Sequence, residues 1–384
     1  MSKVKRDKMK TLKSILIMVV LLIATTILIC QNGQKTLSIK LPEFKQSAQI
    51  FPEERGRWET AAADIDNDGD LDLIISHMKL KTAIYLNDGK GFFIKSSQKF
   101  QSELHGLSCG DLDNDGDIDL IFTSLNKNQA SPIYINNGRG AFELYKFPPS
   151  IETGIIVNLI DIDKDGDLDV FINRSGPLYL NNGKGNFSKS SSTLPAVTSF
   201  YDLNKDGAVD ILSAVHGSGF KVYLNDKKGN FTEFSFLPKS DLIFCYTDFA
   251  DIDNDGDIDV IYSNGNDKEK YSAGILLNDG TGRLIDSGQK LSTVEFGYVG
   301  TGDLNNDGFT DVIIADNKNP AKVWLNDGKG IFIDSGITLG EGIGWTNCLI
   351  KDLDNDGDMD VFITRIGGGN HGLWFNRLME NKKK

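Results

Sequence analysis

Seven short segments of this 384-residue chain concentrate carboxylates at a fixed spacing. Each spans nine residues with the pattern D-x-(D/N)-x-D-G-x-x-D, and the first, residues 64–72, reads DIDNDGDLD. Positions 1, 3 and 5 can turn side-chain oxygens toward one point, while glycine at position 6 permits a sharp turn. Position 7 offers its backbone carbonyl, and aspartate at position 9 closes the shell. This pattern predicts an oxygen-only cage for a hard cation, which relieves the repulsion between the carboxylates.

Calcium suits this donor set best, because it takes about six to eight oxygens in flexible geometry, whereas magnesium keeps more of its water. Zinc and copper are disfavoured because the segments contain no cysteine or histidine. An EF-hand is excluded because it needs flanking helices and a glutamate at its twelfth position. One such segment alone could be a solvated acidic turn. Seven in register favour bound Ca²⁺ as the cofactor, with up to seven ions.

We call these segments loops 1 to 7. Their candidate metal ligands, loop by loop, are Asp64, Asp66, Asp68, Asp70 and Asp72; Asp111, Asp113, Asp115, Asp117 and Asp119; Asp161, Asp163, Asp165, Asp167 and Asp169; Asp202, Asn204, Asp206, Ala208 and Asp210; Asp251, Asp253, Asp255, Asp257 and Asp259; Asp303, Asn305, Asp307, Phe309 and Asp311; Asp352, Asp354, Asp356, Asp358 and Asp360.

Two loops depart from the pattern. Asn204 and Asn305 replace the aspartate at position 3, which removes one negative charge from each of these cages. Because ligand charge tunes calcium affinity, we expect loops 4 and 6 to bind more weakly. Ala208 and Phe309 occupy position 7 in the same loops and can still offer a backbone carbonyl.

The elements around the loops are short strands. Successive loops start 47, 50, 41, 49, 52 and 49 residues apart, a period typical of propellers and solenoids. An apolar run such as LDLIIS follows each loop, and a hairpin such as AIYLNDGKGFF (residues 83–93) comes later in the repeat. Each repeat therefore predicts four strands, with the loop between the first two. The fold class is all-β, a seven-bladed β-propeller over residues 41–378.

The chain ends predict how the propeller closes. The seventh repeat ends soon after its third strand, whereas residues 41–51 precede the first repeat and resemble a fourth strand. We expect residues 43–51 to supply the missing outer strand of blade 7.

The N-terminal region is distinct from the repeats. Residues 1–13 carry six basic residues and one acidic residue, and residues 14–30 are uncharged and mostly apolar. This predicts a basic cytoplasmic segment followed by a signal anchor or signal peptide, then a linker at 31–40. We expect a membrane-anchored, extracytoplasmic protein at the cell surface or in a periplasm, or a secreted one if the segment is cleaved. A basic tail occupies 379–384.

Charge bears on the partner. The net charge is −13, so the region after residue 13 is still more acidic, which argues against nucleic acid as a partner. An acidic exterior is instead consistent with bound cations.

The combination of DIDNDGDLD with YLNDGKGFF resembles the VCBS/FG-GAP repeats of the integrin-α-like propeller family. The resemblance covers about residues 41–378 and is closer to the VCBS form, because the Phe-Gly signature is limited to Phe296–Gly297. It implies calcium in the loops on one face, ligands at the other face, and adhesion or recognition at the cell surface. The family also includes domains attached to polysaccharide-active enzymes.

The face opposite the loops is where an extracellular protein or a glycan could bind. Strand alternation predicts aromatic and basic residues there, with acidic sugars or protein loops as possible ligands: Trp58, His77, His105, Arg174, His216, Trp345, Arg365 and His371. These residues could equally be ordinary rim residues that pack the blades together.

No catalytic residue is indicated by the sequence, and His371 is the best candidate for an acid or base. An adhesion or recognition module is the leading hypothesis. A lyase-like, polysaccharide-active enzyme using the face opposite the loops is the alternative, and a purely structural calcium module is a third possibility.

Overall fold

The computed structural model describes residues 39–51, 58–77, 82–101, 104–124, 130–145, 154–173, 175–192, 194–242, 245–264, 273–291, 297–341, 344–365 and 370–380. Residues Pro42–Lys384 form one compact unit. The expected basic segment, anchor and linker up to residue 38 lie outside the described residues, as does most of the basic tail. None of the described residues belongs to a helix with the length and apolarity needed to span a membrane.

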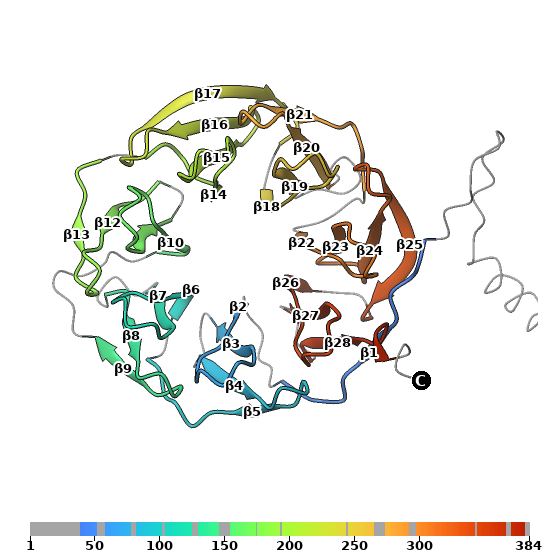
Figure 1. Cartoon of the computed structure of the whole chain (residues 1–384), viewed down its shortest axis with the longest axis horizontal. Coiled ribbons are helices and arrows are strands. Elements are labelled where there is room, and N and C mark those ends of the chain that lie inside the picture. The colour runs from blue at the N-terminus through green and yellow to red at the C-terminus, as the bar shows by residue number, and fades with distance from the viewer. Residues whose placement is uncertain are drawn as a thin grey trace, which may run out of the picture. The chain divides into compact units, whose positions relative to one another are not determined.

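Seven four-stranded antiparallel sheets make up the compact unit. They surround a common axis like the blades of a propeller (Figure 1). The predicted all-β, seven-bladed propeller is therefore confirmed.

The strands of the first four blades are as follows. Blade 1 contains β2 (Trp58–Ala63), β3 (Asp72–His77), β4 (Ala83–Asn87) and β5 (Phe93–Lys95); blade 2 contains β6 (Leu104–Gly110), β7 (Asp119–Ser124), β8 (Ile133–Asn136) and β9 (Phe142–Tyr145); blade 3 contains β10 (Val157–Ile160), β11 (Asp169–Ile172), β12 (Leu178–Leu180) and β13 (Ser188–Lys189); blade 4 contains β14 (Ser199–Tyr201), β15 (Asp210–Val215), β16 (Gly219–Asn225) and β17 (Phe231–Pro238).

The remaining blades follow the same order. Blade 5 contains β18 (Cys245–Ala250), β19 (Asp259–Asn264), β20 (Gly274–Asn278) and β21 (Leu284–Asp286); blade 6 contains β22 (Tyr298–Gly302), β23 (Asp311–Ala315), β24 (Ala321–Asn326) and β25 (Phe332–Leu339); blade 7 contains β26 (Trp345–Lys351), β27 (Asp360–Arg365), β28 (Gly372–Asn376) and β1 (Phe44–Gln46).

The core lies between neighbouring blades. One cluster, for example, joins Ile74 and Ile84 of blade 1 to Leu120, Phe122 and Tyr134 of blade 2. The second strand of each blade is buried on both faces, which explains why these strands read as continuous apolar runs.

Blade 7 is completed from the other end of the chain, as the sequence predicts. β1 pairs antiparallel with β28, with Phe44 opposite Asn376 and Gln46 opposite Trp374. Phe51 is fully buried, and its ring lies 5.2 Å from that of Tyr85 in blade 1 and 5.1 Å from that of Phe362 in blade 7. The N-terminal strand β1 and Phe51, which lies farther along the chain, therefore join the first and last repeats.

Candidate metal centres

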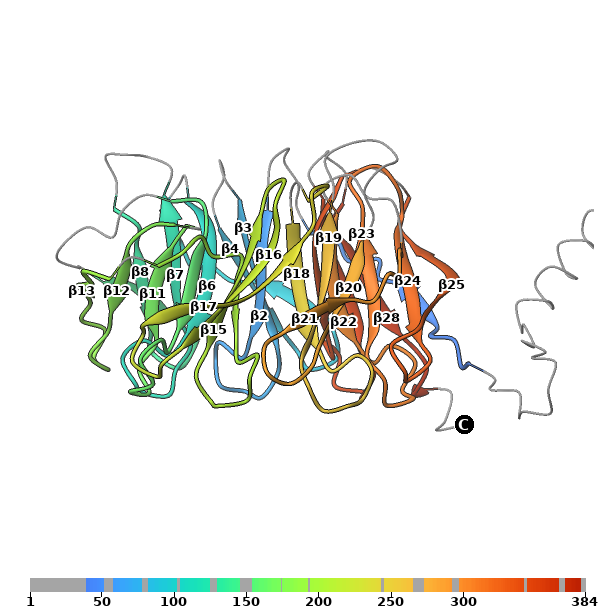
Figure 2. The same ribbon diagram turned by 90° about the horizontal axis from the view of Figure 1, so that it is seen from above.

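All seven loops connect the first strand of a blade to the second. In blade 1, Ala63 pairs with Asp72, so loop 1 spans the gap between the ends of two neighbouring strands. The same register places each loop at the same end of its blade, along the lower edge of the ring in Figure 2. The loops therefore gather on one face.

Each loop is held in shape by its own aspartates. In loop 1, Asp64 accepts hydrogen bonds from the backbone amides of Asp68 (3.1 Å) and Gly69 (3.0 Å). Asn67 has a φ of 59° and Gly69 a φ of 93°, left-handed conformations that asparagine and glycine tolerate best. The sequence places those residue types where the backbone reverses, so that ligand oxygens of Asp64, Asp66 and Asp72, at positions 1, 3 and 9, lie within 4.8 Å of one another.

The aspartate at position 9 fixes the loop to the blade. Asp72 is fully buried, and its two oxygens accept from the amides of Ile65 (3.0 Å) and Asn87 (2.7 Å). The equivalent pair of bonds forms in every loop, at Asp119, Asp169, Asp210, Asp259, Asp311 and Asp360. Burial raises the pKa of Asp72 to about 6 and that of Asp360 to about 8.

A ring of buried asparagines holds each loop against its neighbour. The Asn136 side chain donates to the carbonyl of Ile118 in its own blade (3.0 Å) and to that of Ile65 in loop 1 of the preceding blade (2.7 Å). The cross-blade bond recurs around the whole propeller, from Asn87, Asn181, Asn225, Asn278, Asn326 and Asn376. From the sequence, these residues are expected only as part of the hairpins. Their presence in every repeat was the available signal.

Five loops bring three carboxylates together in the way a cation requires. Ligand oxygens of the following groups lie within 4.8 Å of one another: Asp64, Asp66 and Asp72; Asp111, Asp113 and Asp115; Asp161, Asp163 and Asp165; Asp251, Asp253 and Asp255; Asp352, Asp354 and Asp356. Each of these five groups could hold a metal ion, and in loop 1 the aspartate at position 9 takes the place of the one at position 5.

The carboxylates at position 3 in these five loops are only partly satisfied by hydrogen bonds. One oxygen each of Asp66, Asp113, Asp163, Asp253 and Asp354 is buried without a hydrogen-bond partner among the described residues. Burial raises the pKa of Asp66, and the charges of Asp68 and Asp64 raise it further. A buried, unsatisfied carboxylate oxygen is costly, and a bound cation removes that cost. The residues of these loops therefore fit a calcium ion.

Loops 4 and 6 are different, as expected from their asparagines. The amide of Asn305 donates to the carboxylate of Asp307 at 2.9 Å, and that of Asn204 approaches Asp206 at 3.5 Å. The Lys227 ammonium also donates to the backbone carbonyl of Asp206 at 2.9 Å. Protein donors thus supply part of the charge compensation in loops 4 and 6.

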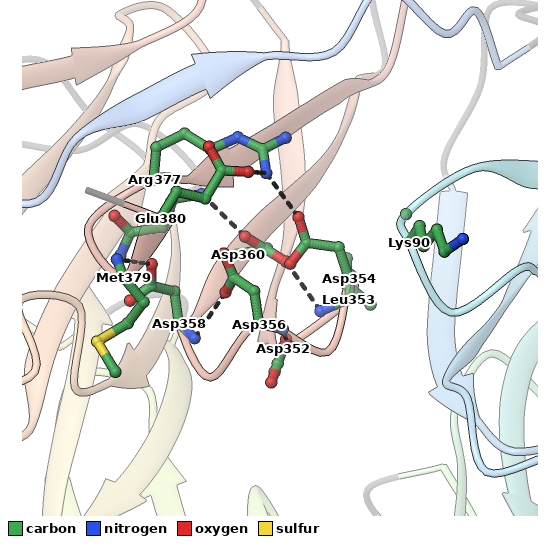
Figure 3. A network of polar contacts seen from close by, with 12 residues as sticks. Lys90, Asp352, Leu353, Asp354, Asp356, Asp358, Asp360, Arg377, Met379 and Glu380 are labelled. Carbon is green, nitrogen blue, oxygen red and sulfur yellow. Dashed lines mark hydrogen bonds and ion pairs between the residues drawn. The ribbon is translucent and has the colours of Figure 1, made fainter. Parts of the chain in front are cut away.

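Loop 7 has an additional basic partner that the sequence analysis missed (Figure 3). Arg377, just after β28, contacts Asp354 at 2.8 Å and Glu380 at 2.6 Å. Burial and the charge of Asp356 still raise the pKa of Asp354 to about 6, although Arg377 opposes this shift. Arg377 therefore partly neutralises loop 7 while leaving one Asp354 oxygen unsatisfied.

Of the residues proposed for the opposite face, those that the structure describes lie at or next to strand ends, and they differ in exposure. Trp58 pairs with His77, and Trp345 pairs with Arg365, in the first and second strands of their blades. His216 is exposed. His105 is only 5% exposed, with its Nδ1 2.9 Å from the carbonyl of Ile155.

His371 is only 2% exposed, and its Nδ1 accepts from the amide of Arg365 at 3.1 Å. Two of the proposed histidines are therefore integrated into the blades. Arg174 lies outside the described residues.

Comparison with known proteins identifies the repeat. The FG-GAP-like repeat family matches residues 111–172, 202–262 and 303–363. Each match starts at a loop and ends in the second strand of the next blade. No curated protein sequence matches the chain.

The chain is similar to several solved structures at low sequence identity. The BP39L lectin from Burkholderia pseudomallei is 11% identical with a TM-score of 0.56, and the match covers 84% of this chain and 96% of that chain. BBS1N in complex with ARL6DN is 13% identical with a TM-score of 0.56, covering 88% and 97%. The Photorhabdus luminescens Tc holotoxin pore is 13% identical with a TM-score of 0.46, covering 91% of this chain but 17% of that one. The likeness to the lectin and to BBS1N concerns the fold alone.

Proposed function

Because the chain is a seven-bladed propeller with FG-GAP-like repeats, we propose that it is a calcium-stabilised recognition module, anchored in a membrane and facing outward. The buried, donorless oxygens at position 3 in loops 1, 2, 3, 5 and 7 carry the calcium part of this proposal. Calcium binds all three carboxylates of such a loop at once, and it thereby ties the first two strands of the blade together.

The calcium sites differ in strength. Loops 1, 2, 3, 5 and 7 bind calcium tightly, whereas loops 4 and 6 bind it weakly or not at all, because asparagine amides replace one ligand charge. Anchoring rests on the basic and apolar residues 1–30. The recognition role rests on the repeat type, and the shared fold of a lectin is consistent with it.

Thermal unfolding of the full chain tests the calcium proposal. When the free calcium concentration is 100 times the Kd of a site, binding at that site stabilises the folded protein by about 2.7 kcal/mol. We therefore expect a large rise in melting temperature with calcium over chelator, and a smaller rise with the same concentration of magnesium. Equal shifts with both ions, or no shift, would refute selective calcium binding.

A matched pair of variants locates the sites. Asp113→Asn gives loop 2 the asparagine that loop 4 carries naturally, and should reduce the number of tightly bound calcium ions by one. Asn204→Asp makes the reverse change in loop 4 and should add one. Ion counting by equilibrium dialysis reads out both variants. A glycan and protein-ligand screen in calcium then tests the recognition role.

A further inference from the structure

The residue at the apex of a loop reaches the loop of the next blade. Position 4 lies in the left-handed region in all seven loops, with φ between 53° at Asn306 and 65° at Lys164. The Asn67 amide donates to Asp117 of loop 2 at 2.7 Å, and the Asn114 amide donates to Asp167 of loop 3 at 2.7 Å.

The same link forms at three more boundaries. Asn306 donates to Asp358 at 2.7 Å, Asn355 donates to Asp70, and Lys205 forms an ion pair with Asp257. Every one of these links runs from position 4 of one loop to position 7 of the next.

The residue at position 7 connects the cation site of its own loop to the apex of the neighbouring loop. Its backbone carbonyl is the expected ligand of its own cation, while its side chain accepts from the neighbouring apex. The amide of Asp117 is also fixed by Asp115 at 3.0 Å. On its other side, Asp117 covers Gly138, where an added Cβ would lie 2.7 Å from the carboxylate. A change in the conformation of one loop therefore alters the hydrogen bond to the position-7 residue of the next loop.

Two boundaries lack this link because their position-7 residues have no carboxylate. Ala208 follows Lys164 around the ring, and Phe309 follows Asn254. The Lys164 side chain lies beside Gly207 instead, and Asn254 approaches the carbonyl of Gly328 at 3.5 Å. The links therefore form one long arc through loops 6, 7, 1, 2 and 3, and one short arc through loops 4 and 5.

We propose that these apex side chains couple the cation sites of neighbouring blades, so that loops 7, 1, 2 and 3 bind calcium cooperatively while loop 5 binds it independently. This inference rests on the calcium function proposed above and assigns its regulation. Positions 4 and 7 act as positioning residues, since the apex side chain binds no ion itself.

The physical basis is shared ordering. A cation that orders loop 2 fixes the position of Asn114, which holds Asp167 where loop 3 needs it. The next cation then orders a loop that has already lost part of its freedom, which is positive cooperativity without a large structural change. The links that join loops 7, 1, 2 and 3 are single exposed hydrogen bonds, so we expect a coupling factor of about 5 per link, at the low end of typical values.

Calcium titration of the full chain by calorimetry tests the proposal. The wild-type protein should show four cooperative ions and one independent ion, with a Hill coefficient above 1 for the first group. Asn114→Gly removes the side chain at a φ of 61° that glycine adopts freely. It should reduce the cooperative group to three ions and weaken binding at loop 3 about 5-fold.

The chain offers a matched control at an unlinked boundary. Asn254 also has a φ of 61°, but the residue that follows it around the ring is Phe309. Asn254→Gly should leave the titration unchanged, and Asn67→Gly should divide the long arc between loops 1 and 2. Circular dichroism in calcium verifies that each variant is folded.

The outcomes separate the two proposals. Five independent ions in the wild-type protein, or equal effects of Asn114→Gly and Asn254→Gly, would overturn the coupling while leaving the calcium sites intact. A chain that binds no calcium would overturn both.

Discussion

The asparagine ring makes a strong prediction about stability at Asn136. This residue is 4% exposed, and its side chain donates to Ile65 at 2.7 Å and to Ile118 at 3.0 Å. The side-chain oxygen Oδ1 of Asn136 also accepts a hydrogen bond from the backbone amide of Asn137 at 2.8 Å. Asn136→Ala removes all three bonds and leaves two backbone carbonyls, one in each blade, without this donor.

The magnitude follows from those contacts. A net hydrogen bond contributes about 1 kcal/mol, and a buried polar group left unsatisfied costs about 1–3 kcal/mol. We therefore expect Asn136→Ala to lower the free energy of unfolding by about 3–4 kcal/mol.

Urea unfolding followed by circular dichroism and by tryptophan fluorescence measures this loss. Asn137→Ala is the control, because Asn137 is exposed and its side chain accepts only from nearby amides of the same turn. We expect it to cost about 1 kcal/mol or less. Equal losses for the two variants would refute the argument that the buried ring, and not the turn, provides the stability.

Three further predictions follow from the structure. In the folded protein the pKa of Asp72 is raised to about 6 and that of Asp360 to about 8, above the unfolded value of about 3.9. The protein in the presence of a chelator, without calcium, should therefore lose stability as the pH rises from 4 to 8. Urea titrations across that range check this, and a gain toward pH 8 without calcium would contradict it. Phe51→Ala should cost about 3–5 kcal/mol by emptying a fully buried site, whereas Ile50→Ala, at a 67% exposed position, should cost little in the same titration. Gly138→Ala should lower the melting temperature more than Gly116→Ala, because both have positive φ but only the former meets Asp117; equal shifts would exclude the clash.

Repetition made much of this fold predictable from one sequence. Seven copies of the loop fixed the number of blades, and the hairpin signals fixed four strands in each. The missing strand of the seventh repeat and the extra strand before the first predicted that β1 would pair with β28. Each of these inferences depends on local pattern, which a single chain displays many times.

Contacts between blades were harder to predict. The cross-blade bonds of Asn136 and Asn67 depend on how far one blade is rotated against the next, and local pattern contains no such information. His105 and His371 sit at the predicted strand ends, yet both are buried, because burial there depends on neighbouring segments. The contact of Arg377 with Asp354 likewise requires the position of the chain after β28.

The closure of blade 7 has a consequence for the order of folding. The amide of Glu43 donates to Asn376, a residue 333 positions later in the chain. Closing a flexible loop of that length costs about 5 kcal/mol in chain entropy, before the constant term. A ribosome releases β1 long before β28 exists, so this strand waits unpaired while six blades form. The propeller therefore acquires its last sheet only after β28 has been synthesised, and until then blade 7 lacks its outer strand.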